Sequence, residues 1–231
     1  MDKLTFGKGN AKLGENVFTF SIPAGWTCPG ARDCLAKAGR DTGKISDGPN
    51  VEFRCFSASM EARQPSVRLS RWRNFDLLRA AGTADAMSAL ILESLPSKAT
   101  LVRIHVGGDF FSPAYFRAWV QVAESRPGVT FYAYTKSVAY LPERASLPSN
   151  LRIVVSDGTR FGTDKARALG YAVASVAFDL TGDLPIDHDD KHAIAADHDF
   201  ALLIHGTQPR GSDAARALSA VKRSGFHGYG K

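Results

Sequence analysis

Short apolar segments alternate with helix-forming segments through most of this 231-residue chain, and this alternation limits the fold more than any other feature. The segments predicted to be strands are 17–22, 101–106, 129–134, 151–155, 172–178 and 200–204. Helices are predicted at 71–81, 83–95, 112–125, 163–169 and 212–223, with Thr83, Ser112 and Ser212 as capping residues. Strands that alternate with helices form parallel sheets through crossover connections. The sequence therefore predicts an α/β protein of about six βα units, either a doubly wound open sheet or a full or partial βα barrel.

The sequence predicts one domain, 1–231, because no composition shift or low-complexity tract divides the chain. No apolar run reaches the roughly 18 residues that would span a bilayer. The first residues, MDKLTFGKGNAK, lack the apolar core of a secretory signal. We therefore expect a cytoplasmic protein, in the host cell if a phage encodes it, with no membrane partner.

The charge balance is mildly basic, with a net charge of +6 and a pI of about 9.3. Such a surface permits binding to nucleic acid or to an anionic small molecule, but it requires neither. The basic residues are dispersed except for Arg68, Arg71, Arg73 and Arg79. A solvated surface is the simpler reading of this charge, and nucleic-acid binding through the four arginines is the alternative.

The three cysteines, Cys28, Cys34 and Cys55, all fall in the first quarter of the chain. Two of them lie in a Gly- and Pro-rich stretch, and we treat residues 23–55 as one cysteine-containing loop. An odd number of cysteines argues against a disulfide framework, and thiolates suit iron–sulfur clusters and zinc. A structural zinc takes four protein ligands, whereas a [4Fe–4S] cluster held by three thiolates leaves one iron open. The favoured prediction is a cluster; zinc with a distant His or Asp, and buried cysteines without a metal, remain open.

Polar residues follow each predicted strand, at the edge where parallel α/β folds place their ligands. The residues that we predict to bind a cofactor there are Gly107, Gly108, Asp109, Lys136, Ser156 and His205. The glycines would allow close approach of the backbone to a ligand, and Asp109 would accept hydrogen bonds from a ligand amine. A simple βα turn with Asp109 as a helix cap is the alternative.

The remaining histidines carry weaker signals. His105 alternates with the apolar positions of its strand, so it is either an interior histidine or a group near the cluster. His188, His192 and His198 lie in the acidic stretch DHDDKHAIAADHD, for which a solvated loop and helix is favoured over a metal site. No P-loop, G-x-S-x-G or H-E-x-x-H motif occurs.

The order of first strand, cysteine loop and second βα unit with a Gly-Gly-acidic turn resembles the radical S-adenosylmethionine enzymes. In this sequence the cysteines are separated by five and then twenty residues. The resemblance implies that Cys28, Cys34 and Cys55 hold a [4Fe–4S] cluster whose open iron binds S-adenosylmethionine. It also implies that Gly107, Gly108 and Asp109 contact the amino group of that cofactor, in a full or partial βα barrel.

A closer resemblance covers most of the chain. The stretches FSIPAGWTCPGARDCLAKA, CFSASMEAR, IHVGGDFFSPAYFRAWVQVA, FYAYTKS and LIHGTQPRGS are similar to the phage-associated family called gene product 88. This resemblance implies a phage origin and no particular reaction.

Two functions follow from these expectations. The first is a radical S-adenosylmethionine-like enzyme with an unknown substrate, in which the protein binds and orients the cofactor. The second is a non-enzymatic protein with a structural or redox-sensing cluster, or with zinc, associated with nucleic acid through its arginines. Loss of affinity at high salt would be the signature of such an association.

Overall fold

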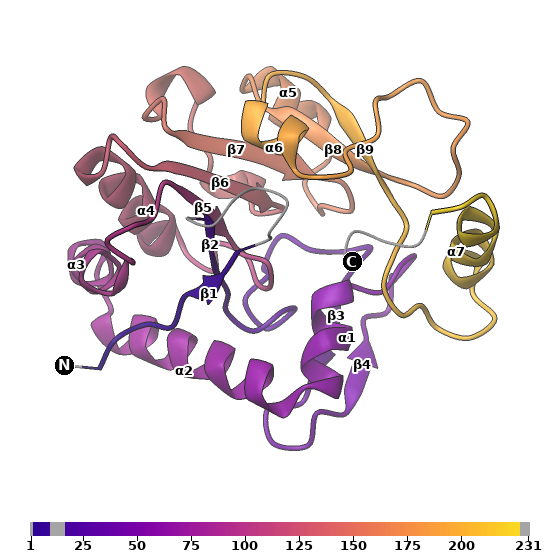
Figure 1. Cartoon of the computed structure of the whole chain (residues 1–231), viewed down its shortest axis with the longest axis horizontal. Coiled ribbons are helices and arrows are strands. Elements are labelled where there is room, and N and C mark those ends of the chain that lie inside the picture. The colour runs from indigo at the N-terminus through magenta and orange to yellow at the C-terminus, as the bar shows by residue number, and fades with distance from the viewer. Residues whose placement is uncertain (1, 10–16, 227–231) are drawn as a thin grey trace.

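The structure is a computed structural model that describes residues 2–9 and 17–226. It is a mixed α/β fold built on a seven-stranded sheet with the order β1-β2-β5-β6-β7-β8-β9 (Figure 1). The strands of this sheet are β1 Gly7–Lys8, β2 Val17–Phe20, β5 Leu101–Ile104, β6 Thr130–Thr135, β7 Leu151–Ser156, β8 Ala172–Ala177 and β9 Phe200–Leu203. β1 pairs antiparallel with β2, and every other pairing is parallel. The predicted parallel βα architecture is therefore confirmed, with β1 as an additional edge strand.

The parallel strands follow one another across the sheet in their order along the chain. A doubly wound sheet reverses direction at a switch point, and this order contains no reversal, so that alternative is wrong. A closed barrel would pair the first strand with the last. Within the residues described, β1 and β9 do not pair, so the structure shows an open sheet and no closed barrel.

The sheet is buried on both of its faces, as continuous apolar strands suggest. On one face the buried rings of Trp119 and Phe131 join the main core with helices α3 (Ala84–Ser94) and α4 (Pro113–Ser125). On the other face Tyr132 packs with Phe200 and with Ala193. Ala193 belongs to the short helix α6 (Lys191–Ala195), so α6 lies opposite the main core. Adjacent residues of β6 thus point to opposite sides, which leaves the second face to carry the polar groups described below.

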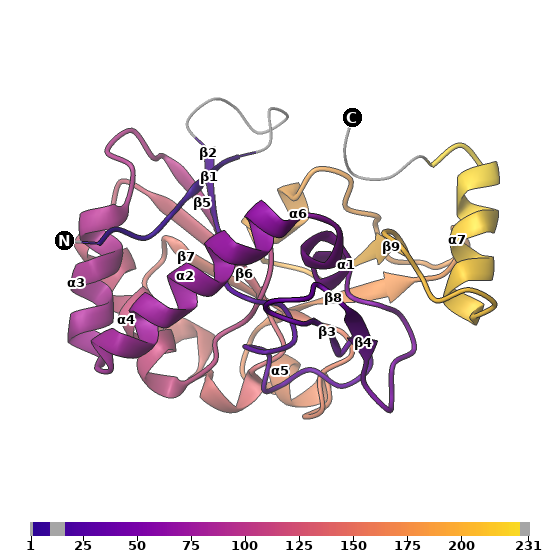
Figure 2. The ribbon, with the colours of Figure 1, turned by 90° about the horizontal axis from the view of Figure 1, so that it is seen from below.

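The helices begin largely where their capping residues predict. Thr83, Ser112 and Ser212 each accept a backbone hydrogen bond at the start of a helix, as expected. The other helices are α1 Phe56–Arg63, α2 Pro65–Ala81, α5 Asp164–Ala168 and α7 Asp213–Arg223, with 3₁₀ turns at Val138–Tyr140 and Arg144–Ser146. Figures 1 and 2 show α2 extending from beside α3 to α1, with α7 at the opposite end from α3. None of the helices in the described part of the chain is long and apolar enough to cross a membrane.

Two elements differ from the prediction. The cysteine loop, expected to be irregular, contains the hairpin of β3 (Ala36–Ala38) and β4 (Ile45–Asp47). Gly43 supplies the positive φ of 66° that the hairpin connection requires. The helix expected to start at 71 begins at Pro65 and follows the unpredicted helix α1. The buried faces of α1 and α2 carry Ser57, Glu61 and Arg71, so their inward sides look polar in the sequence.

Candidate functional site

A cavity of about 190 Å³ lies where the parallel strands end, beneath the cysteine loop and the start of α1. All three cysteines line it. So do all of the residues predicted to bind a cofactor, namely Gly107, Gly108, Asp109, Lys136, Ser156 and His205. The structure thus brings every predicted site residue to one place, from segments up to 177 residues apart (Cys28 to His205). Apolar side chains, among them Phe56, Val176 and Leu203, form much of the remaining wall.

Each cysteine is held by a different part of the fold. The backbone N–H of Gly25 donates to Cys28 Sγ at 3.2 Å. Next to Cys34, the N–H groups of Arg32 and Asp33 donate to the Gly158 carbonyl, in the turn after β7. Cys55 is the residue that precedes α1. The parts of the cysteine loop that carry Cys28, Cys34 and Cys55 are therefore tied to the protein around the cavity, whereas much of the hairpin of β3 and β4 is exposed.

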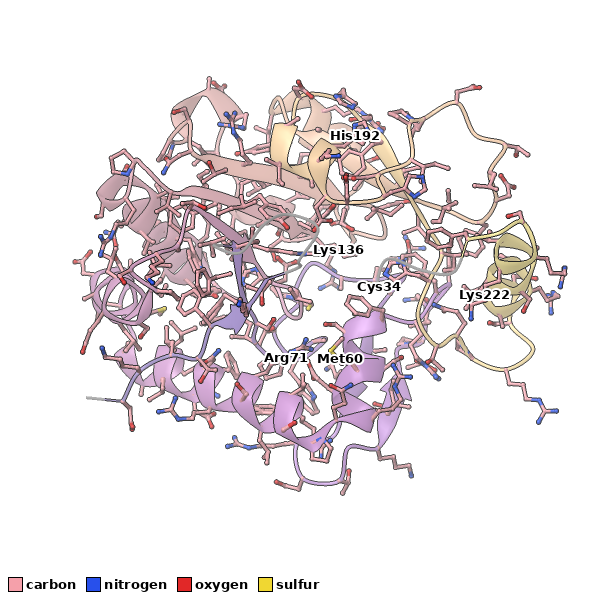
Figure 3. All side chains as sticks on the ribbon, viewed as in Figure 1. Cys34, Met60, Arg71, Lys136, His192 and Lys222 are labelled. Carbon is pink, nitrogen blue, oxygen red and sulfur yellow. The ribbon has the colours of Figure 1, made fainter. Side chains whose placement is uncertain are left out.

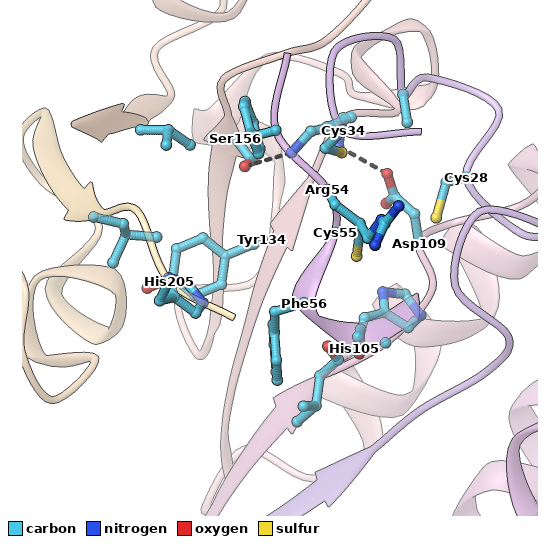
Figure 4. A pocket seen from close by; sticks show the side chains of 18 of the residues that line it. Cys28, Cys34, Arg54, Cys55, Phe56, His105, Asp109, Tyr134, Ser156 and His205 are labelled. Carbon is cyan, nitrogen blue, oxygen red and sulfur yellow. Dashed lines mark hydrogen bonds between the residues drawn. The ribbon is translucent and has the colours of Figure 1, made fainter. Parts of the chain in front are cut away.

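The sulfur atoms of Cys28, Cys34 and Cys55 lie around the carboxyl group of Asp109 (Figure 4). Burial raises the pKa of the Cys28 thiol well above its ordinary value, and the charges of Asp109 and the other two cysteines add to this. Burial also raises the pKa of Cys34 to about 11, although the nearby Lys136 opposes the shift. Within residues 2–9 and 17–226, no group of three His, Cys, Asp or Glu side chains is arranged to hold a metal ion.

Three hydrogen bonds from the protein hold the carboxylate of Asp109. Its carboxylate accepts from Thr135 Oγ1 at 2.6 Å, from the Lys136 N–H at 2.8 Å and from the Phe110 N–H at 2.7 Å. Burial raises the pKa of this carboxyl, whereas these three hydrogen bonds lower it. Asp109 thus joins the ends of β5 and β6, and it does not cap α4, whose cap is Ser112.

The glycines before Asp109 pack against the protein. A Cβ on Gly107 would lie 2.5 Å from Arg71 Nη1, and one on Gly108 would lie 2.4 Å from Ile22 Cγ1. Gly108 also has a φ of 86°. Both residues border the cavity, yet the close approach that their missing side chains allow is to the neighbouring chain segments.

Lys136 places a half-buried ammonium in the cavity. Its Nζ donates to Ser156 Oγ at 2.6 Å (Figure 4). Burial alone would lower the pKa of Lys136, but the charges of Cys34, Asp109 and the other cysteines raise it overall. The lysine therefore provides positive charge beside the thiols.

Arg103, a further candidate for cofactor or substrate contacts in the sequence, belongs to a polar network on the same face of the sheet that is centred on Asp190, a partner that the sequence does not predict. Arg103 Nη1 donates to Asp190 Oδ2 at 2.8 Å, and the hydroxyls of Tyr132 and Tyr134 donate to the same carboxylate at 2.8 and 3.2 Å. The guanidinium of Arg103 stacks on the Tyr134 ring, and both residues line the cavity. The alternation of Arg103, Tyr132 and Tyr134 with apolar neighbours is the signal that marks this face in the sequence.

The histidines divide between the cavity and the surface. His205 lines the cavity, and burial lowers its pKa. His105 also lines it, with Nε2 3.0 Å from the Tyr115 hydroxyl and Nδ1 buried without a hydrogen-bond partner. The rings of His192 and His198 contact each other at 2.7 Å outside the cavity. His192 belongs to α6, and Figure 3 shows it apart from Cys34 and Lys136.

Two of the four arginines considered for nucleic-acid binding are buried, whereas Arg73 and Arg79 are exposed. Arg68 and Arg71 are only 6% and 5% exposed. Arg71 Nη1 donates to Glu61 Oε1 at 2.6 Å, and Arg68 Nη1 donates to the Glu61 carbonyl at 2.7 Å. These two side chains hold α1 against α2, so the proposed basic patch of four arginines is wrong.

Comparison with known proteins identifies relatives in bacteriophages. Residues 2–223 match the family model described as Gene product 88. The Gene 88 protein of Mycobacterium phage L5 is 30% identical over 187 residues, which cover 73% of this chain and 71% of the relative. The Gene 88 protein of Mycobacterium phage D29 is 29% identical over 187 residues, with 73% and 70% covered. No solved structure matches the chain.

These matches agree with the closer of the two sequence resemblances, and they do not support the resemblance to radical S-adenosylmethionine enzymes. The family model spans the cysteine loop, the sheet and the final helix. The chain belongs to the gene product 88 family.

Proposed function

We propose that this protein binds a [4Fe–4S] cluster through Cys28, Cys34 and Cys55 and acts as a radical S-adenosylmethionine-like enzyme. The observation that supports the proposal most is that all the cysteines of the chain line one cavity at the carboxyl ends of the parallel strands. Thiolates are the preferred protein ligands of iron–sulfur clusters. Ligands in parallel α/β folds bind at this edge of the sheet.

The donor set suits a cluster with one open iron. Three thiols are present, and no fourth cysteine exists in the chain. Each thiolate of a cluster binds a different iron, so the sulfurs need not converge as tightly as they do around one ion. When bound, the cluster would pass one electron from an external one-electron donor to S-adenosylmethionine and so cleave it reductively.

The residues of the chain would bind and orient the cofactor. Asp109 keeps a free acceptor position on Oδ2, which takes a single hydrogen bond from the protein, and this oxygen would accept from the amino group. Lys136 and Arg103 would attract the carboxylate and other anionic groups. The apolar walls at Phe56, Val176 and Leu203 would exclude water from the reacting groups.

Metal analysis of protein purified without oxygen tests the first step. Brown protein with iron and sulfide supports the cluster, and colourless protein with stoichiometric zinc contradicts it. The serine variants Cys28→Ser, Cys34→Ser and Cys55→Ser should each lose most of the iron. If all three variants keep wild-type iron, the ligand assignment is wrong.

Cofactor cleavage tests the second step. Reduced, cluster-loaded protein should convert S-adenosylmethionine to 5′-deoxyadenosine, and Lys136→Met should weaken cofactor binding at least tenfold. Lys98→Met is the matched control, because Lys98 is exposed and does not line the cavity. If cluster-loaded protein neither binds nor cleaves the cofactor, the enzyme proposal is wrong, and the cluster has a structural or redox-sensing role.

A further inference from the structure

The turn after β9, residues 205–208, contacts the segment that carries the third cysteine. Gln208 is the centre of this contact and is only 9% exposed. Its Oε1 accepts from the backbone N–H of Arg54 at 2.7 Å. Its Nε2 donates to the carbonyl of Arg54 at 3.3 Å and to the carbonyl of His205 at 2.7 Å. One side-chain amide therefore binds both backbone groups of the residue immediately before Cys55.

Only a side-chain amide of the length of glutamine can make these three hydrogen bonds. The Arg54 N–H needs an acceptor, and the two carbonyls need donors, so the two ends of the amide cannot be exchanged. Glutamate has no donor, and methionine has neither group. The sequence separation of 154 between Arg54 and Gln208 makes this a contact across the fold and not a local turn.

The rest of the turn fits the same segment closely. A Cβ on Gly206 would lie 2.8 Å from Phe56 Cβ, and Gly206 has a φ of 76°. The rings of His205 and Phe56 are 5.3 Å apart. On the other side, the Arg54 side chain pairs with Asp47 of β4 at 2.5 Å. The residue before Cys55 is thus fixed by its backbone to the end of the sheet and by its side chain to the hairpin.

We propose that Gln208 is a positioning residue that holds Cys55 at the cavity. This inference rests on the proposed function for its consequence, since a well-placed Cys55 serves as the third cluster ligand. The positioning itself is a property of the polypeptide and is measurable without any metal.

The first test uses the reactivity of Cys55 in metal-free protein. In a Cys28→Ser/Cys34→Ser background only Cys55 reacts with iodoacetamide, and Gln208→Ala should raise its alkylation rate at least tenfold. Gln208→Glu should also raise the rate, because the carboxylate keeps the acceptor and loses both donors. In a Cys34→Ser/Cys55→Ser background, Gln208→Ala should leave the alkylation rate of Cys28 unchanged, which separates local release from unfolding.

The second test uses the cluster. Gln208→Ala should release iron to a chelator at least tenfold faster than wild type and should alter the electron paramagnetic resonance spectrum of the reduced cluster. Gln121→Ala is the matched control. Gln121 also donates to a side chain, that of Asp85, but it belongs to α4 and does not line the cavity. If wild-type protein binds no iron, the proposed function fails while the alkylation test of Gln208 still stands. Wild-type alkylation of Cys55 in both Gln208 variants overturns the positioning role.

Discussion

His105 combines a strained backbone with a buried, neutral ring. Its φ is 67°, a left-handed conformation that is uncommon for residues other than glycine, although Asn, Asp and His adopt it more often than the rest. Burial lowers the pKa of its imidazole to about 3. The tyrosine hydroxyl at 3.0 Å is its hydrogen-bond partner. The ring therefore stays uncharged in the folded state at pH values where the unfolded chain would protonate it.

This difference predicts an acid-sensitive stability. Between pH 6.5 and about 3 the unfolded state binds a proton at His105 that the folded state does not. Stability from this group is complete above pH 6.5 and falls as the pH is lowered through that window, by at most roughly 5 kcal/mol. Urea unfolding at pH 5 and pH 7 measures the fall. His105→Asn, which tolerates positive φ, should show a shallower fall; an equal slope in both proteins would contradict the prediction.

Substitution of Gly108 should destabilise the fold for two reasons, its positive φ and a steric clash, and glycines elsewhere in the chain allow the two to be measured separately. Gly108→Ala combines a positive φ with a Cβ 2.4 Å from Ile22, and we expect a loss of about 3 kcal/mol or more. Gly162→Ala has a positive φ but open space, so about 1–2 kcal/mol should be lost. Gly128→Ala has neither problem and should be near neutral. Urea midpoints rank the three; equal losses at all three positions would exclude the steric argument.

At the scale of elements, the pair Glu61–Arg71 joins α1, α2 and the cysteine loop. Glu61 is completely buried, accepts from Arg71 at 2.6 Å and also accepts from the backbone N–H of Ala24. Burial raises the pKa of Glu61 despite the arginine. Because both charges are desolvated, removing one partner leaves the other uncompensated.

A double-mutant cycle tests this link. Glu61→Met and Arg71→Met should each cost about 3–5 kcal/mol, and the double variant should cost less than the sum of the two. The exposed pair Arg40–Asp76, whose side chains are 48% and 45% exposed, is the control and should show coupling below about 1 kcal/mol. The measurement is the free energy of unfolding in urea. Additive losses at Glu61 and Arg71 would show that the pair does not act as a unit.

The sequence predicts those elements whose signals are local. The helix caps at Thr83, Ser112 and Ser212 and the apolar strands depend on neighbouring residues, and they were placed within a few positions. Functional residues in parallel α/β folds lie at the carboxyl ends of the strands, and the site residues predicted on that basis do line one cavity. Helix α1 was missed because its buried face carries Ser57, Ser59 and Glu61, whose partners lie in distant segments. The partners of Arg103 and Gln208 are equally remote in sequence.

At the scale of the whole molecule, the sequential strand order determines which parts of the chain must be folded for the cavity to form. Each strand lies beside the next one along the chain, so the strand ends form a continuous edge from β2 to β9. The cysteine loop contacts this edge through Gly158 after β7 and Gln208 after β9. The three thiols consequently reach the cavity only when most of the chain has folded.

Cluster binding should therefore stabilise the entire fold. A ligand that binds the folded state alone, present at a thousand times its dissociation constant, adds about 4 kcal/mol. For a chain of 231 residues this corresponds to a rise in the unfolding midpoint on the order of 10 °C. Anaerobic reconstitution with iron and sulfide should raise the thermal midpoint by this amount, and removal of iron by a chelator should reverse it.

The cysteine variants make this prediction specific. Cys28→Ser, Cys34→Ser and Cys55→Ser each remove one thiolate and should abolish the rise, although Cys28 and Cys55 lie at opposite ends of the loop. Nonspecific binding of iron to the surface would instead raise or lower all midpoints alike. A rise that survives in any single variant would mean that the corresponding sulfur is not a ligand. Cys34 follows the residues that donate to the Gly158 carbonyl after β7, and Cys55 follows Arg54, which Gln208 binds after β9. If Cys34→Ser and Cys55→Ser both abolish the rise, the stability that the cluster adds depends on the half of the sheet that contains β7 and β9.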